Sequence, residues 1–350
     1  MRALIIIVIS LSYMVLTPWV AFSQSEGESD LQEVPDLQEV KVLELNFQDV
    51  TETVQSRLLD APEASLLYLN HWIDVYNKRA QDTQTPLFNK RPIAPPKSDA
   101  AYQATDGLSA WRPNGTPIVS PHWSNSKPLS FDDAGQFRPP PPPETHTHIF
   151  ERDVEEVFRL GEKYGENRPV DGSVMAAFWA DGIGTISPPG RWNLIALEQS
   201  REWSTDRRIK LMLALNIALY DAGIAAWDSK YHYQYWRPTR AITKLYPEHA
   251  DWSPMMQPPF HPEYVSGHSA FSGAGAAILE TLIGPKSFCV TSEELLGLTR
   301  CFSSFTDAAR KAGRSRIFGG IHYEFSNQAG QKLGRDVAHQ VLETFSAYAR

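Results

Sequence analysis

The residues best suited to chemistry in this sequence form three short clusters between positions 230 and 322. The first cluster contains Lys230 and, seven positions later, Arg237, which Pro238 follows. On a helix a spacing of seven is nearly two full turns, so both cations would project from one face. A solvated helix face is the alternative, but the four aromatic residues between positions 231 and 236 are too apolar for one.

The second cluster is the tripeptide Ser266-Gly267-His268, which comes directly before a helix expected over residues 266–284. A glycine at a helix N-terminus lets backbone amides converge on an anion, and the helix dipole adds partial positive charge there. The hydroxyl supplies a donor and the imidazole a proton carrier. The alternative is that Ser266 is an ordinary N-cap and that the histidine is incidental.

The third cluster contains Arg316, then a Gly319-Gly320 pair, and then His322. An arginine offers a planar fork of donors that suits a tetrahedral oxyanion, and the glycine pair permits a close backbone approach. The ring of His322 can act as a nucleophile or as a metal ligand. Taken alone, the histidine could equally satisfy local hydrogen bonds at a helix start.

The order and spacing of the three clusters resemble the signature of one superfamily. It joins type 2 phosphatidic acid phosphatases, soluble bacterial acid phosphatases and vanadium haloperoxidases. The signature consists of a lysine, six residues and Arg-Pro, then Ser-Gly-His, then Ser-Arg, five residues and His. All three parts occur here in that order, over residues 230–322, and the surrounding sequence looks like the bacterial haloperoxidase-like branch.

The resemblance implies a role for each matching residue. Five residues would hold the oxygens of vanadate or phosphate: Lys230, Arg237, Ser266, Gly267 and Arg316. In the haloperoxidases the residue matching His322 is the protein ligand of vanadate, and the residue matching His268 serves as acid and base. In the phosphatases the first attacks phosphorus to form a phosphohistidine, and the second protonates the leaving alcohol.

Two further positions favour haloperoxidase chemistry. Trp227 stands three residues before Lys230 and matches a tryptophan on the halide side of the haloperoxidase pocket. His261 stands five residues before Ser266, where the family's bromoperoxidases tend to have histidine and its chloroperoxidases phenylalanine. Alternatively, Trp227 belongs to the core and His261 only caps a turn.

The resemblance therefore implies a vanadium-dependent haloperoxidase. Its cofactor would be vanadate and its substrates hydrogen peroxide and a halide, with bromide or iodide favoured. The alternative is a soluble histidine acid phosphatase that acts on phosphate esters. A third hypothesis is a protein that binds phosphate or vanadate with little turnover.

The sequence also departs from the family pattern. Val265 replaces the proline that usually precedes Ser-Gly-His in the phosphatases. Ser326 stands where an aspartate often follows the last histidine by four residues. Such an aspartate would orient or polarise the imidazole of His322, and its loss weakens the expected activation. The spacing of Glu324 points that carboxylate to another face.

Composition limits the remaining possibilities. The chain has 350 residues, of which 42% are hydrophobic, and a formal charge of −8, so neither whole-chain disorder nor a broad nucleic-acid surface is expected. Residues 1–23 have the charged start, apolar run and small-residue end of a signal peptide. No later stretch looks long and apolar enough to span a membrane. The mature protein is thus expected outside the cytoplasm, in the periplasm or the extracellular space.

The two cysteines, Cys289 and Cys301, leave two possibilities open. In an oxidising compartment they could form a disulfide, which would stabilise the protein by roughly 3 kcal/mol on the chain-entropy model. Alternatively, both are buried thiols.

The predicted fold is an all-α helical bundle with an irregular, proline-rich N-terminal segment. After the signal come an acidic flexible lead-in over 24–52, with a helix only toward its end, and a segment over 53–143. The latter combines a turn near Pro62, a helix to about Arg79, and a proline-rich wrapping that ends in five prolines. Residues 144–350 form the helical catalytic domain, interrupted at 182–192, and no β-alternation is evident.

Overall fold

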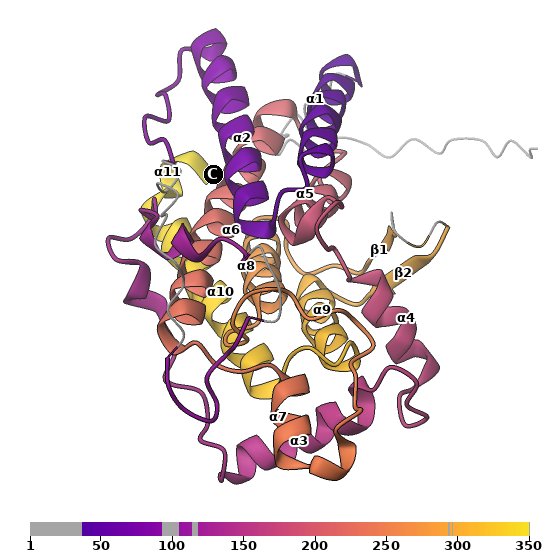
Figure 1. Cartoon of the computed structure of the whole chain (residues 1–350). Coiled ribbons are helices and arrows are strands. Elements are labelled where there is room, and N and C mark those ends of the chain that lie inside the picture. The colour runs from indigo at the N-terminus through magenta and orange to yellow at the C-terminus, as the bar shows by residue number, and fades with distance from the viewer. Residues whose placement is uncertain (1–36, 93–104, 114–117, 293–294, 296, 350) are drawn as a thin grey trace, which may run out of the picture. The chain divides into compact units, whose positions relative to one another are not determined.

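The computed structural model describes residues 37–92, 105–113, 118–292, 295 and 297–349. The expected signal over residues 1–23 and the start of the acidic lead-in lie outside these residues. The described chain is mostly helical, which confirms the predicted all-α class (Figure 1). Its α-helices are α1 (Leu37–Ser56), α2 (Ala61–Thr83), α3 (His148–Gly161), α4 (Val170–Phe178), α5 (Ser187–Gln199), α6 (Thr205–Tyr233), α7 (Pro238–Leu245), α8 (Gly267–Leu282), α9 (Phe305–Phe318), α10 (Glu324–Thr344) and α11 (Ser346–Ala349).

Shorter elements connect these helices. Three 3-10 helices are η1 (Pro121–Asn125), η2 (Ala134–Phe137) and η3 (Pro247–His249). Strands β1 (Phe288–Thr291) and β2 (Thr299–Phe302) form an antiparallel hairpin in which Cys289 pairs with Cys301. A disulfide joins these two cysteines, so the first of the two possibilities holds. The hairpin is a difference from the expected absence of strands, because strands of four residues are too short to show a periodic pattern.

Helix α6 is the central element of the core. Most of its residues are buried, and it packs against α2, α5, α8 and α10. By length and hydropathy α6 also meets the criteria for a membrane span, so the expectation that no such stretch follows the signal was wrong. Within its most apolar window 94% is buried inside the protein, as expected of a core helix.

Helices α8 and α10 lie unusually close together, and this contact brings two of the sequence clusters to one place. A Cβ at Gly334 of α10 would lie 2.1 Å from the carbonyl oxygen of Ala270 in α8. A Cβ at Gly273 of α8 would lie 2.4 Å from the carbonyl oxygen of Gln331. Small residues therefore allow the two backbones to touch, and the N-terminal ends of both helices reach the same region.

The proline-rich segment lies along α6 in space and is held there by hydrogen bonds. The hydroxyl groups of Tyr233, Tyr264 and Tyr235 donate to the carbonyl oxygens of Pro139, Pro140 and Pro143, respectively. Prolines lack the N–H that a helix or sheet would use, so their free carbonyls are available to these tyrosines. The expected irregular wrapping over this part of the chain is therefore present.

Helix boundaries differ from expectation in two places. Helix α1 begins at Leu37, well before the predicted end of the acidic lead-in. Helix α5 begins at Ser187 although Pro188 and Pro189 suggested a break through residue 192. Proline is compatible with the first turn of a helix because the N–H groups there have no intrahelical partner. Pro62 is compatible with the first turn of α2 for the same reason. Asp60 is the N-cap of this helix, so the chain turns just before Pro62, as predicted.

Candidate active site

Lys230 and Arg237 reach the site from two different helices. Lys230 lies in the last turn of α6, the chain turns at Gln234 with a φ of 47°, and Arg237 is the N-cap of α7. The interpretation that both project from one helix face was therefore wrong. Both side chains instead converge on the loop before α8.

Lys230 is fully buried and donates to backbone carbonyls of that loop. Its Nζ lies 3.0 Å from the oxygen of Pro262 and 2.9 Å from that of Glu263, and it also contacts the oxygen of Val265. Three carbonyls facing one ammonium fix its position at the base of the site.

Arg237 is buried and joins the loop to the third cluster. Its Nη1 lies 2.8 Å from the carbonyl oxygen of Ile321 and 3.1 Å from Nε2 of His322. Its Nη2 lies 3.1 Å from both Nδ1 and the carbonyl oxygen of His261. Because a guanidinium can only donate, Nε2 of His322 must accept in this contact.

The second cluster has the predicted geometry at the start of α8. Ser266 is the N-cap; its fully buried Oγ accepts from the amide and the hydroxyl of Ser269. A Cβ at Gly267 would lie 3.3 Å from Cζ3 of Trp227, so the glycine allows the helix start to lie against the indole ring. The expected capping role of Ser266 and its place in the site are therefore compatible.

His268 and Arg316 share one backbone partner. Nε2 of His268 lies 3.0 Å from the carbonyl oxygen of Ala180, and Nη1 of Arg316 lies 3.4 Å from the same oxygen. Arg316, in the last turn of α9, also donates from Nη2 to the oxygen of Ala176 at 2.9 Å. Arg316, the third cation of the site, is thus adjacent to His268.

A tight turn between α9 and α10 positions His322. Gly320 has a φ of 77°, and a Cβ there would lie 2.4 Å from the carbonyl oxygen of Gly161. Only glycine fits both the left-handed backbone and this close approach. The turn leaves His322 two residues before the first residue of α10.

The carboxylate that faces His322 is Glu263, which sequence reasoning missed. Its Oε1 lies 2.6 Å from Nδ1 of His322 and 3.2 Å from the amide nitrogen of Tyr323. Glu263 is fully buried, and it reaches the histidine from the loop before α8. The sequence offered only a weak signal, since Glu263 is a single acidic residue three positions before Ser266, in a stretch rich in proline and aromatic residues.

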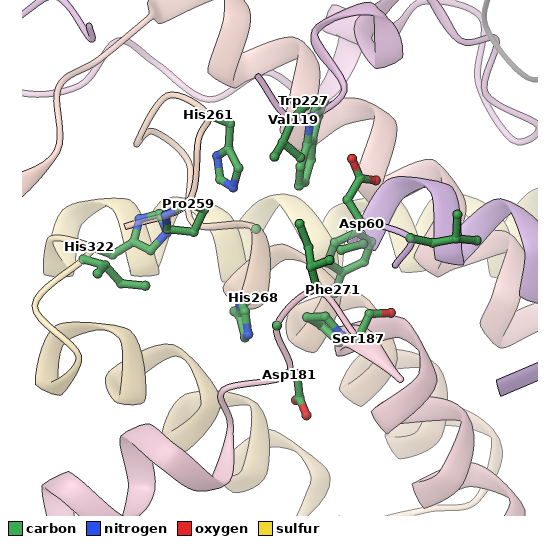
Figure 2. Close-up of a pocket in the computed structure, with 17 residues that line it drawn as sticks. Asp60, Val119, Asp181, Ser187, Trp227, Pro259, His261, His268, Phe271 and His322 are labelled. Atoms are coloured by element: carbon green, nitrogen blue, oxygen red, sulfur yellow. Dashed lines mark hydrogen bonds between the residues drawn. The ribbon is translucent and has the colours of Figure 1, made fainter. Parts of the chain in front are cut away.

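Several of these residues line one cavity of about 110 Å³, which we call the histidine cavity. Its wall includes His261, His268 and His322 together with Trp227, Gly267 and Ile321. Figure 2 shows the three histidines on one side of the cavity and Asp60, Ser187 and Phe271 on the other. Trp227 and His261 lie with ring centroids 5.1 Å apart, so both predicted pocket residues contact the site.

Burial and mutual repulsion control the charges in the site. Burial and the neighbouring Arg237 hold the pKa of Lys230 well below its ordinary value, and burial lowers that of Arg237 to about 10. Burial, with the charges of Arg237 and Lys230, likewise holds the pKa of His322 well below 6.5, so its imidazole is neutral. Burial raises the pKa of Glu263 to about 7, although the two cations partly offset this effect.

These groups fit an oxyanion. Among Lys230, Arg237, Arg316 and Glu263 three side chains are cations and one is a carboxylate, and Asp60 and Asp181 also line the cavity. Burial is the main cause of the lowered pKa of Lys230 and the charge of Arg237 adds to it, so an anion placed beside them would favour the charged ammonium. A neutral imidazole with its lone pair on Nε2 is the form that binds a metal centre, and a bound oxyanion would displace the Arg237 contact that this lone pair accepts. The donor set therefore fits a vanadate or phosphate group beside Nε2 of His322.

Comparisons with known proteins point to the vanadium haloperoxidases. A family model described as the second helical-bundle domain of VCPO matches residues 210–350. The vanadium chloroperoxidase of Curvularia inaequalis is 33% identical over 129 residues, which cover 29% of this chain and 21% of that protein. Over its C-terminal helical part this chain is therefore similar to the vanadium haloperoxidases.

Two solved structures are also similar to this chain. A bacterial vanadium-dependent iodoperoxidase matches with a TM-score of 0.60 and 31% identity, over 68% of this chain and 61% of the other. A bacterial vanadium-dependent chloroperoxidase in its holo form matches with a TM-score of 0.59 over 78% and 69% of the two chains. At 19% identity the latter shows a shared fold only. The chain spans about a fifth of the fungal haloperoxidase and less than two thirds of the iodoperoxidase.

Proposed function

We propose that this protein is a vanadium-dependent haloperoxidase that oxidises iodide or bromide with hydrogen peroxide. The observation that carries the proposal is the environment of His322. Its Nδ1 faces the Glu263 carboxylate and its Nε2 faces Arg237, in the wall of a cavity shared with two more histidines. The similarity of residues 210–350 to the second helical-bundle domain of VCPO supports the same conclusion.

In this proposal the residues of the chain have distinct tasks. Lys230, Arg237 and Arg316 balance the negative charge of vanadate, and the start of α8 adds Ser266 and the amide of Gly267. His322 supplies the ligand nitrogen. Bound vanadate would supply a Lewis-acidic centre that makes hydrogen peroxide reactive toward halide.

His268 is proposed as the proton carrier. Burial and the charge of Arg316 hold the pKa of its imidazole well below 6.5, so the ring is neutral. A neutral ring whose Nε2–H donates to Ala180 keeps an acceptor at its other nitrogen. It can therefore take a proton from peroxide as that substrate binds.

The proposed halide preference rests on Trp227 and His261. Both line the histidine cavity, and His261 occupies the position at which bromoperoxidases of the family tend to have histidine. The likeness to an iodoperoxidase at 31% identity supports oxidation of the heavier halides.

A soluble histidine acid phosphatase is the second candidate, and Glu263 is the observation that favours it. A carboxylate on Nδ1 makes the opposite ring nitrogen a better nucleophile, as a phosphohistidine mechanism requires. In that reaction Nε2 of His322 would attack the phosphorus of a phosphate ester, and His268 would protonate the departing alcohol.

We also propose that the protein is exported to the periplasm or the extracellular space. The signal-like residues 1–23 motivate the proposal, and the disulfide between Cys289 and Cys301 supports it, since disulfides persist in oxidising compartments. Expression of the full-length gene, followed by N-terminal sequencing of the exported protein, would test it. A retained N-terminus and reduced cysteines would contradict it.

The two reactions can be separated in a single set of assays. Purified protein in phosphate-free buffer is given orthovanadate, hydrogen peroxide and iodide, bromide or chloride in turn, beside a His322→Ala variant. Halide oxidation that requires orthovanadate and is lost in the variant supports the haloperoxidase. Hydrolysis of a phosphate ester that orthovanadate inhibits, with a phosphate trapped on His322 and no halide oxidation, would establish the phosphatase instead.

A further inference from the structure

We propose that Glu263 is the positioning residue of His322 and takes the place of the aspartate that the family pattern has at position 326. It would accept the Nδ1 proton and so keep the lone pair of Nε2 directed at the bound oxyanion. In this chain the orienting carboxylate has thus moved from the helix after His322 to the loop before α8. The inference rests on the proposed oxyanion site but not on which of the two reactions occurs there.

The contacts of His322 allow only one tautomer. A carboxylate accepts and a guanidinium donates, so Nδ1 must carry the proton and Nε2 the lone pair. Arg237 alone would leave the ring free to tilt, because a single contact does not fix a plane. Glu263 supplies the second contact on the opposite side of the ring.

Glu263 is itself held in place from two directions. Its backbone N–H donates to the carbonyl oxygen of Tyr235 at 2.9 Å, and its Oε1 accepts from the amide of Tyr323 at 3.2 Å. A fully buried carboxylate with fixed contacts loses little further entropy when it orients a neighbour. This rigidity distinguishes Glu263 from a flexible charge that merely lies near the histidine.

Glu324 and Ser326, the two residues considered in place of Glu263, do not contact the imidazole ring of His322. The carboxylate of Glu324 is bound to Arg314 at 2.9 Å and to the side-chain amide of Asn327 at 3.1 Å. Ser326 is fully buried at the third position of α10, and neither its hydroxyl nor Oε2 of Glu263 has a hydrogen-bond partner among the described residues. The serine hydroxyl therefore does not take over the role of the aspartate, and the Glu263 carboxylate contacts His322 instead.

The first test measures the tautomer of His322 in the protein without added oxyanion. Nitrogen-15 NMR of histidine-labelled protein, with the His322 signals assigned by their loss in His322→Gln, distinguishes a proton on Nδ1 from one on Nε2. We expect the proton on Nδ1 in the wild type and a mixture of tautomers in Glu263→Leu. A wild-type ring protonated on Nε2 would overturn the inference without any variant.

The second test measures orthovanadate affinity by isothermal titration calorimetry. Glu263→Leu should weaken binding about 10- to 100-fold, the usual effect of removing a partner of a metal-binding histidine. Adding Ser326→Asp to this variant should restore most of the lost affinity, because the third position of a helix accommodates a carboxylate that can reach back toward His322. Unchanged affinity in Glu263→Leu would refute the proposal.

A matched control separates positioning from general damage. Asp153 is also a fully buried carboxylate near the start of α10, where it accepts from the amide of Phe325 at 2.6 Å without touching His322. Asp153→Asn should bind orthovanadate like the wild type. If Glu263→Leu does not fold, Glu263→Gln keeps an acceptor oxygen and should retain the wild-type tautomer, and a changed tautomer there would count against the proposal.

These outcomes differ from failure of the proposed function. A folded wild type that binds neither orthovanadate nor phosphate would contradict the oxyanion site itself. Equal orthovanadate affinity in the wild type and in Glu263→Leu would leave the oxyanion site intact and exclude only the positioning role of Glu263.

Discussion

Asp221 lies fully buried in the middle of α6 and anchors the proline-rich segment to the core. Its Oδ1 accepts from the amide of Leu129 at 2.8 Å, and its Oδ2 accepts from the amide and the hydroxyl of Ser130 at 2.9 and 2.5 Å. Burial nevertheless raises the pKa of Asp221 from 3.8 to about 6, because these hydrogen bonds and the charge of Lys90 offset only part of the desolvation.

This pKa makes the contribution of Asp221 depend on pH in a definite direction. Between the unfolded pKa near 3.8 and the folded pKa near 6, the native protein holds a proton that the unfolded chain has released. The stability that Asp221 contributes is therefore complete below about pH 4 and is lost as pH rises through 6. The difference of about two pH units between the folded and the unfolded pKa of Asp221 corresponds to about 3 kcal/mol of stability.

The variant Asp221→Asn isolates this effect because asparagine does not titrate. It should be less stable than the wild type at pH 4, since its amide group faces backbone donors, by about 1–3 kcal/mol. That deficit should shrink by up to about 3 kcal/mol between pH 4 and pH 7. Urea unfolding followed by circular dichroism at pH 4, 5, 6 and 7 measures the difference in stability, and a deficit that stays constant or grows with pH would contradict the raised pKa of Asp221.

Three other changes test the site and its support. Arg237→Lys keeps the charge but loses the two-pronged contact, so calorimetry should show orthovanadate binding about 10- to 100-fold weaker; equal affinity would contradict the assigned contacts. Gly320→Ala should reduce the free energy of unfolding by at least about 2 kcal/mol, because of its positive φ and the close oxygen of Gly161, and an unchanged melting temperature would argue against this turn. Replacing Cys289 and Cys301 with alanine should cost roughly 3 kcal/mol in urea unfolding yet leave orthovanadate affinity unchanged, since neither lines the histidine cavity; reduced affinity would show an unexpected coupling.

The helical class could be predicted because long apolar runs such as Thr205–Tyr233 carry a strong signal. The boundaries were harder, since Pro188 and Pro189 are as compatible with a first helical turn as with a loop. The hairpin that joins Cys289 to Cys301 was missed because its strands are too short for alternation to be visible.

The components of the site could be identified from spacing, but their arrangement could not. Lys230 and Arg237 were expected on one helix face, whereas a left-handed residue at Gln234 ends α6 between them. The partner of His322 is 59 residues away in sequence at Glu263, and local spacing contains no information on such a contact. Only the packing of α8 against α10 brings these two residues together.

The proposed haloperoxidase would hold one vanadate at His322, with hydrogen peroxide as the oxidant of the halide. The most direct measurement is a titration of orthovanadate into purified protein, with iodide oxidation by hydrogen peroxide as the readout. We expect activity to rise with orthovanadate, to saturate near one vanadate per chain and to be absent from a folded His322→Ala variant. Activity that does not depend on orthovanadate, or that survives in His322→Ala, would contradict the haloperoxidase proposal.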